Sequence, residues 1–332
     1  MKAVNAGYII IDEPNITKKI ERIARVCYKS ENCIKEGSDL AMISRLVKNK
    51  HYAMLEHGTL AYEVSKSVYK EIQELLDETM NRQDINVPRL HMSYNCQENR
   101  YVISGNLRTY LEFFEAVDKS YLTSSIPLLY EHVHQDSNEC IGYEFKNIEQ
   151  YYNTKDKIIR IDDFNELSVK ERMIHETVSV LFTIDKGVSH ELVRHRDASF
   201  AQESSRYCSY DKGKFGSEIT CVKPCFWAED TSMYKAWKES CEFAEKTYMD
   251  MLGNGATPQE ARSVLPHSLK ADITCTANLY EWQHIFDLRA LDKTGPAHPQ
   301  MKEVMVPLYK EFEERFPEIF MNENELETEL DM

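Results

Sequence analysis

The 332-residue sequence lacks any long apolar run. The longest are short pieces such as Tyr8–Ile11 and Val180–Phe182, whereas a membrane span needs about 20 consecutive apolar residues and a signal peptide needs a charged start before its apolar stretch. We therefore expect a cytoplasmic protein without a membrane partner. Apolar residues make up 42% and charged residues 29% of the chain, a balance that excludes a disordered or fibrous protein.

The sequence also lacks paired cysteines. Its nine cysteines contain no C-x-x-C pair, which argues against structural zinc and against a secreted disulfide scaffold. Cys221 and Cys225 have no second pair nearby. His190 and His195 are five residues apart, whereas zinc ligands shared on a helix are four apart. The sequence thus predicts reduced, mostly buried thiols and no metal.

Basic residues are in the minority. Forty basic and 55 acidic side chains give a formal net charge of −15, so the averaged field of the chain repels nucleic acid. This excludes a nucleic-acid partner, and an anionic ligand would have to be bound by a local basic cluster. The motifs of other enzymes are missing as well: no G-x-S-x-G serine elbow occurs, and Gly253-Asn254-Gly255 lacks the third glycine of a dinucleotide site.

Neither repeats nor flexible linkers divide the chain. We expect one domain over residues 1–320 and an acidic tail over 321–332. Apolar spacing predicts helices at 17–29, 39–50, 69–80 and 107–117 and strands at 60–64 and 178–184, the last followed by a turn at 185–187. This mixture indicates an α/β fold, and residues 65–173 have the character of a largely helical insertion.

Capping patterns predict the elements of the last third. Ser189 is a candidate N-cap for a helix through Arg196, and Ser199 with Gln202 suggests a second helical start. The segment 257–260 predicts a helix that Pro266 ends. Residues 270–276 alternate like a strand, and residues 278–281 form a capping box for a helix through Arg289.

Two arginines stand on predicted apolar helix faces. Arg289 follows Trp282 by seven residues and Phe286 by three, so it shares their face. A guanidinium facing a core needs a partner, which can be a structural carboxylate or a ligand. Arg262, before Leu265, repeats the situation.

The densest basic cluster lies after the predicted 178–184 strand. Arg194, Arg196 and Arg206 occur with Ser199, Ser204 and Ser205 between them. Guanidiniums offer paired donors to phosphate. On a helix Arg194 and Arg196 would point to roughly opposite sides, about 200° apart, so one solvated stripe cannot hold both. The cluster therefore suggests a phosphate site.

These residues form a pattern that resembles the flavin-dependent thymidylate synthase family. The resemblance rests on Arg194-His195-Arg196 with Ser204 after seven further residues, on 202–207, on 260–266, and on Asn278 and Arg289. The segments 24–28 and 55–59 are similar to N-terminal elements of the family. The resemblance covers about residues 1–64 and 174–312, with a further similar stretch at 103–106.

The resemblance implies an α/β fold with a central sheet flanked by helices. It implies conversion of dUMP to dTMP, with the carbon from methylenetetrahydrofolate, the reducing equivalents from NADPH through FAD, no protein nucleophile, and a homotetramer. The rival hypothesis is a nucleotide- or flavin-binding protein of the same fold without turnover.

The resemblance also implies residue roles. Arg289 would be catalytic and face the uracil. The positions implied for dUMP are Glu191, Arg194, Gln202, Ser204, Ser205, Arg206, Arg262 and Arg289. Those implied for FAD are His57, Thr59, Arg194, His195, Arg196, Gln202, Asn278 and His284. The sequence departs from some members at Glu191 and Gln202, and at Tyr280, where others use an arginine toward the flavin.

Overall fold

The computed structural model describes residues 1–80, 90–117, 126–140, 156–206, 209–211 and 217–321. This part of the chain forms two compact units. The first contains residues 1–11, 24–32 and 178–321, and the second contains 12–23 and the described residues of 33–177. The helix α1 (Ile16–Tyr28) contributes residues to both. The predicted single domain over 1–320 stays a prediction, and residues 322–332 of the predicted tail lie outside the described residues.

The first unit is built on a four-stranded sheet with the order β2-β7-β10-β8. Its strands are β2 (Gly7–Ile10), β7 (Thr177–Asp185), β8 (Ser199–Gln202) and β10 (Lys270–Asn278), and a separate parallel pair joins β1 (Lys2–Val4) to β9 (Thr220–Val222). Its helices are α7 (Lys186–Leu192), α8 (Ser232–Gly253), α9 (Pro258–Ala261), α10 (Leu279–Arg289), α11 (Pro299–Arg315) and α12 (Pro317–Phe320).

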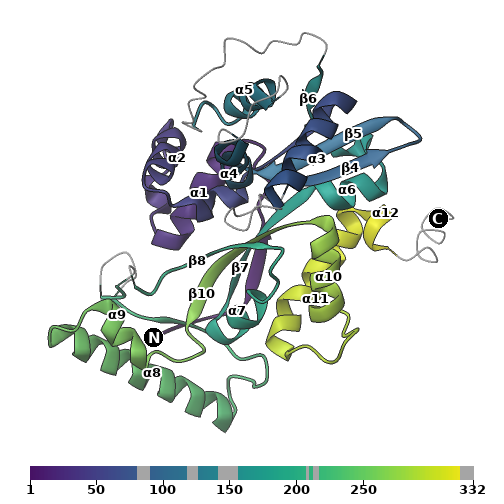
Figure 1. Cartoon of the computed structure of the whole chain (residues 1–332). Helices are drawn as coiled ribbons and strands as arrows, with labels where there is room; N and C mark the ends of the chain where they lie inside the picture. Colours follow the sequence, from purple (N-terminus) through teal and green to yellow (C-terminus); the bar gives the residue numbers. More distant parts are fainter. Residues whose placement is uncertain (81–89, 118–125, 141–155, 207–208, 212–216, 322–332) are drawn as a thin grey trace. The chain divides into compact units, whose positions relative to one another are not determined.

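Helices α10 and α11 pack on this sheet (Figure 1). The core between the sheet and these helices is mostly aromatic. It contains Val180 and Phe182 of β7 and Trp282, Phe286 and Phe312 of the helices. Trp282 also donates its indole N–H to the carbonyl of Val178, at 3.1 Å. A side chain that fills the core and satisfies a strand carbonyl fixes α10 against β7.

The second unit has an antiparallel sheet with the order β4-β5-β3-β6. Its strands are β3 (Thr59–Val64), β4 (His91–Asn95), β5 (Arg100–Asn106) and β6 (Ile158–Arg160). Its helices are α2 (Ser38–Lys48), α3 (Lys66–Met80), α4 (Leu107–Val117), α5 (Ile126–Asp136) and α6 (Val169–His175), and short 3-10 turns span 52–57 and 164–166. A further 3-10 turn, 31–33, contributes residues to both units.

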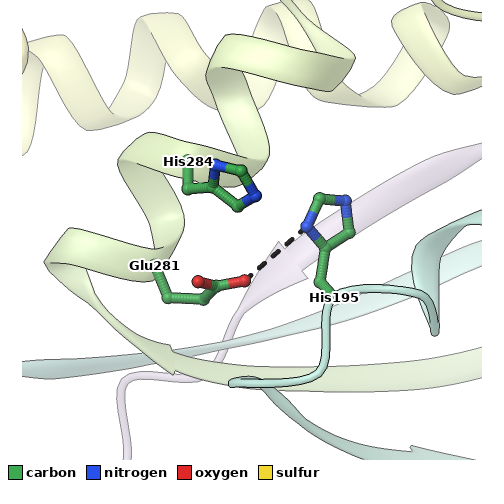
Figure 2. Close-up of side chains that lie close together, drawn as sticks. All are labelled: His195, Glu281 and His284. Carbon is green, nitrogen blue, oxygen red and sulfur yellow. Dashed lines mark ion pairs between the residues drawn. The ribbon is translucent and has the colours of Figure 1, made fainter.

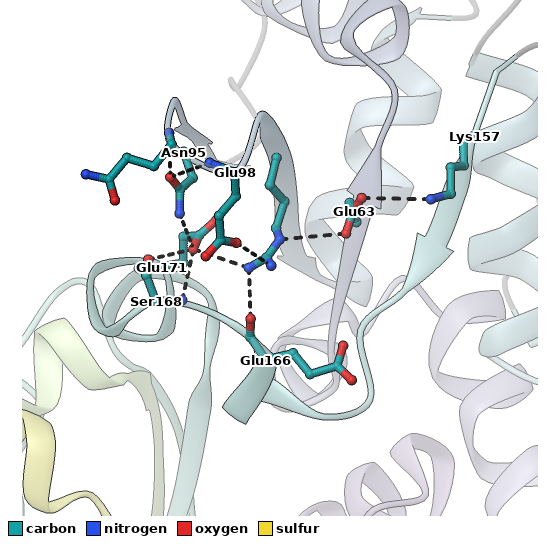
Figure 3. A network of polar contacts seen from close by, with 9 residues as sticks. Glu63, Asn95, Glu98, Lys157, Glu166, Ser168 and Glu171 are labelled. Atoms are coloured by element: carbon teal, nitrogen blue, oxygen red, sulfur yellow. Dashed lines mark hydrogen bonds and ion pairs between the residues drawn. The ribbon is translucent and has the colours of Figure 1, made fainter.

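Polar contacts of Arg100 hold strand β5 to the segment before α6. Figure 3 shows Glu166, Ser168 and Glu171 of this network. The guanidinium donates to the carbonyl of Glu166 at 2.9 Å and lies 3.5 Å from the carboxylate of Glu171. Burial disfavours the charged form of Glu171, but bonds from Ser168 and Asn95 and the charge of Arg100 outweigh it and hold its pKa below the usual range. Glu171 is therefore the ionised centre of this network.

The sequence predicts the mixed α/β class correctly. Four predicted helices and three predicted strands are confirmed, with each end within three residues of its prediction: helices 17–29, 39–50, 69–80 and 107–117, and strands 60–64, 178–184 and 270–276. The insertion at 65–173 stays a prediction. The described part of these residues contains strands β4, β5 and β6 as well as helices.

Among the described residues, no helix is long and apolar enough to cross a membrane.

Three local predictions were wrong. The turn expected at 185–187 is instead the end of strand β7 and the start of helix α7. The helix expected from Ser189 through Arg196 begins at Lys186, because the side chain of Asp185 caps it by accepting from the N–H of Val188 at 2.7 Å, and it ends at Leu192. Residues 199–202 form strand β8, not a helical start, since they pair with residues 273–276 of β10. Long-range strand pairing outweighs a local capping pattern.

A charge network ties strand β10 to Lys29, the residue that follows α1, in the first unit. The carboxylate of Asp272 accepts from Lys270 at 2.7 Å, from Thr183 at 2.9 Å, and from Lys29. Burial disfavours the ionised form of Asp272, but the two ammonium groups outweigh it and lower its pKa. The network therefore stabilises the fold only while Asp272 is ionised.

Asp272→Asn should lower the free energy of unfolding by about 1–3 kcal/mol at pH 7, because it leaves charged donors short of an acceptor. The difference in the free energy of unfolding between the parent and the variant should shrink as the pH falls below about 4. At that pH the carboxylate of Asp272 in the folded parent becomes protonated and loses its charge. Urea unfolding of both proteins from pH 7 downward measures this difference. Glu229→Gln, in an exposed pair with Lys223, is the control and should leave the free energy of unfolding nearly unchanged, because exposed ion pairs contribute little to stability. A difference for Asp272→Asn that does not depend on pH would contradict the account.

Candidate functional site

Helix α10 presents Arg289 in its last turn. The helix begins after Asn278, whose side chain accepts from the N–H of Glu281 at 2.9 Å, so the predicted cap is confirmed. Trp282, Ile285 and Phe286 are fully buried, and the side chain of Arg289 retains 18% of its exposure. The prediction that Arg289 shares the apolar side of the helix is consistent with this burial.

Arg289 meets two residues from the segment that follows β7. Its Nε donates to Nε2 of His195 at 3.2 Å, and its terminal nitrogens lie 3.3 Å from a carboxylate oxygen and from the backbone carbonyl of Glu191. His195 and Glu191 precede Arg289 by 94 and 98 positions in the chain, and the three residues form one contact group. The Arg289 guanidinium is held by long bonds and remains partly exposed, so a ligand could share it.

The contact also fixes the tautomer of the neutral His195 ring. An arginine Nε can only donate, so Nε2 of His195 has to accept and its proton has to be on Nδ1. That Nδ1 lies 3.6 Å from a carboxylate oxygen of Glu281, and Figure 2 shows the two side chains facing each other. Arg289 is therefore hydrogen-bonded to His195, and the other side of the His195 ring faces Glu281 without a hydrogen bond.

A second contact group contains the residues predicted to bind phosphate. Arg262, in the 3-10 turn Arg262–Val264, donates to the hydroxyl of Ser205 at 3.4 Å, and the N–H of Arg206 donates to the hydroxyl of Ser204 at 3.4 Å. Both guanidiniums are exposed. Exposed guanidiniums beside hydroxyls and backbone N–H groups can bind an oxyanion. Tyr207 and Cys208, the next residues of the motif, lie outside the described part of the chain.

The remaining predicted residues of the first unit surround the α7–β8 turn. Arg194 and Arg196 are exposed on this turn rather than on a helix, so the argument from opposite helix faces does not apply to them. Gln202 donates to the hydroxyl of Ser189 at 3.0 Å, which ties β8 to α7. His284 is exposed on α10, and Tyr280 is 61% exposed.

His57 and Thr59 belong to the second unit. His57 is fully buried in the 3-10 turn Tyr52–His57, and burial together with the charge of Lys19 lowers its pKa to about 3. The ring is therefore neutral at physiological pH. Position 58, between these two residues, requires glycine, because a Cβ atom there would lie 2.5 Å from the side chain of Ile20. The part of His57 and Thr59 in a flavin site stays a prediction.

Sequence reasoning missed two residues. Lys29 lies 3.4 Å from the buried carboxylate of Glu203, which also accepts from Lys270 at 2.9 Å, so the two lysines anchor the segment that leads to Ser204. No sequence signal pointed to Lys29. Glu281 faces His195, and its spacing of three from His284 on a predicted helix could have drawn attention to it.

Comparison with known proteins gives consistent results. Residues 150–318, about half of the chain, match the family described as thymidylate synthase complementing protein. A flavin-dependent thymidylate synthase of Pyrococcus abyssi is 33% identical over 127 residues, which are 38% of this chain and 50% of that protein. The enzyme of the same name from Pyrococcus horikoshii is 32% identical over 152 residues, 45% of this chain and 60% of that protein. The chain thus spans about half the length of the curated relatives it matches.

Among solved structures, the UMP/dUMP methylase PolB from Streptomyces cacaoi bound with 5-Br dUMP aligns with 95% of this chain and 93% of its own, at 14% identity and a TM-score of 0.38. This TM-score is too low to define a shared fold. The sequence match covers every described residue of both contact groups, from Glu191 to Arg289. On this match, the chain belongs to the thymidylate synthase complementing protein family.

Proposed function

We propose that the chain is a thymidylate synthase that converts dUMP to dTMP. In this proposal methylenetetrahydrofolate supplies the carbon, and FAD with NADPH supplies the reducing equivalents. The observation that carries it is the contact of Arg289 with His195 and Glu191, because it joins the arginine implied for the uracil to the motif implied for the nucleotide. The names of the flavin-dependent relatives support the same reaction.

The phosphate of dUMP would bind at the exposed contact group of Ser204, Ser205, Arg206 and Arg262. In a chain with a net charge of −15, an anionic substrate needs such a local concentration of guanidiniums. Arg194 and Gln202 would complete the nucleotide site. The base would lie toward Arg289, with Glu191 beside it.

The described donor set fits a flavin dinucleotide. Arg194 and Arg196 expose two guanidiniums on one short turn, which suits a diphosphate. His195, Gln202, Asn278 and His284 would contact the flavin from the first unit. His57 and Thr59, which belong to the second unit, are proposed as FAD-binding residues from the family resemblance alone. Tyr280 offers an exposed ring without charge where other members use arginine. Bound FAD would supply the hydride chemistry that none of these side chains can perform.

The role proposed for Arg289 is electrostatic. A fixed guanidinium stabilises negative charge that develops on the pyrimidine in the transition state, and it needs no reorganisation at that moment. His195 and Glu191 orient it, and its partial exposure leaves donors for the ligand.

Two buried cysteines, Cys140 and Cys275, agree with a route without a thiol nucleophile. Burial raises the pKa of Cys140 to about 11 and that of Cys275 well above its ordinary value. Such thiols are protonated at neutral pH and make poor nucleophiles. We also propose, from the family resemblance alone, a homotetramer in the cytoplasm.

The reaction products test this function. Purified protein supplied with FAD, NADPH, methylenetetrahydrofolate and dUMP should form dTMP and tetrahydrofolate in equal amounts, because the flavin rather than the folate is proposed to supply the hydride. Chromatography of the nucleotide and folate pools measures both. Stoichiometric dihydrofolate would contradict the flavin route, and binding of dUMP without any dTMP would favour a non-catalytic binder.

Arg289→Leu should lower turnover by at least about 100-fold, the scale for removing one preorganised charge stabiliser. Stability should change by no more than about 1 kcal/mol, because the lost bonds are long and the pair with Glu191 is partly exposed. Arg289→Lys should restore little activity, since an ammonium cannot form two parallel bonds to the pyrimidine edge.

The matched control is Arg315→Leu, which removes an arginine from the last turn of α11 and its pair with Glu311. Turnover of this variant should equal that of the parent. Melting temperature and single-turnover flavin oxidation are measured on the same samples. Normal flavin oxidation in a destabilised Arg289→Leu protein would remove Arg289 from the active site.

A further inference from the structure

Three side chains with metal-binding atoms meet next to Arg289. His195, Glu281 and His284 each bring one donor atom, and these atoms all lie within 4.8 Å of one another. Glu281 and His284 are three residues apart on α10 and so share one face of the helix. His195 comes from the turn after α7 and faces them (Figure 2). The cluster thus joins two elements that the sequence separates by more than 80 residues.

Two imidazoles and a carboxylate are a donor set that binds divalent transition metals and leaves further coordination positions open. We propose that His195, Glu281 and His284 form a site for one such ion, of the zinc or cobalt type. This inference goes beyond thymidylate synthesis, because the site needs neither nucleotide nor flavin.

The geometry allows the site to close. A tetrahedral ion that lies about 2.0–2.1 Å from each donor atom holds these atoms roughly 3.4 Å from one another. The distances between the donor atoms of the three side chains therefore have to decrease when the ion binds. His195 and Glu281 are 5% and 7% exposed and form the fixed side, with their facing atoms already 3.6 Å apart. His284 is exposed, and rotation of its side chain brings the third donor in.

Arg289 opposes the ion in two ways. Its Nε donates to Nε2 of His195 at 3.2 Å, which keeps the ring proton on Nδ1, the nitrogen that faces Glu281. A metal on Nδ1 needs that lone pair, so the proton moves to Nε2, where it meets the N–H of Arg289. The guanidinium charge also repels the cation. Metal binding and the Arg289–His195 bond therefore exclude each other.

The test is a titration of the 332-residue chain, freed of flavin and nucleotide, with Co²⁺, followed by visible absorption and calorimetry. We expect one Co²⁺ per chain. His284→Gln should bind it at least about 10-fold more weakly, and so should Glu281→Gln. His267→Gln, which removes another exposed histidine of the same unit, is the matched control and should bind as the parent does.

Arg289→Leu gives the result that an incidental surface site would not give. It removes both the donor to His195 and the repelling charge, so Co²⁺ should bind at least about 3-fold more tightly. Circular-dichroism melting confirms that each variant is folded. No Co²⁺ bound to the parent, equal affinity in His284→Gln and the parent, or unchanged affinity in Arg289→Leu would each overturn the proposal. His195 and His284 are also proposed to touch the flavin, but this titration omits flavin and nucleotide, so its outcome is independent of whether the protein makes dTMP.

Discussion

A guanidinium carried on a mostly buried helix has to find partners, and this requirement organises the first unit. The last turn of α10 carries Arg289, and the rest of the helix is fixed by Trp282 and Phe286 in the core. The carboxylate and carbonyl of Glu191 and the ring of His195 meet the charge. Because these bonds are long and Arg289 keeps some exposure, the pairing is tight enough to orient the guanidinium and loose enough to admit a ligand.

The segment around these partners is held from several sides. Asp185 caps α7, Gln202 ties β8 to the same helix, and Lys29 and Lys270 neutralise Glu203 just before the serines of the motif. Regular structure thus surrounds a short turn that carries exposed arginines. Rigid elements that present polar groups on a turn are a common way to preorganise a binding site.

The sequence predicted those features that depend on near neighbours. The cap at Asn278 and the apolar spacing of Trp282, Ile285 and Phe286 define α10 locally, so its bounds and the place of Arg289 could be predicted. Ser199 and Gln202 were misread because their strand exists only through pairing with residues 273–276. The contacts of Glu281 with His195 and of Lys29 with Glu203 could not be predicted for the same reason, because each joins residues far apart in the chain. The spacing of Glu281 from His284 marks it as a candidate residue but does not show that it faces His195.

The account depends on one nucleotide being recognised through both its phosphate and its base. Calorimetric affinities of dUMP and deoxyuridine, measured for the parent and for Arg206→Leu, test this most directly. Charge-assisted bonds to the phosphate should make dUMP bind at least about 10-fold more tightly than deoxyuridine to the parent. That preference should largely disappear in Arg206→Leu, while the affinity for deoxyuridine stays the same. Equal affinity of the parent for the two compounds, or an undiminished preference in the variant, would contradict the account.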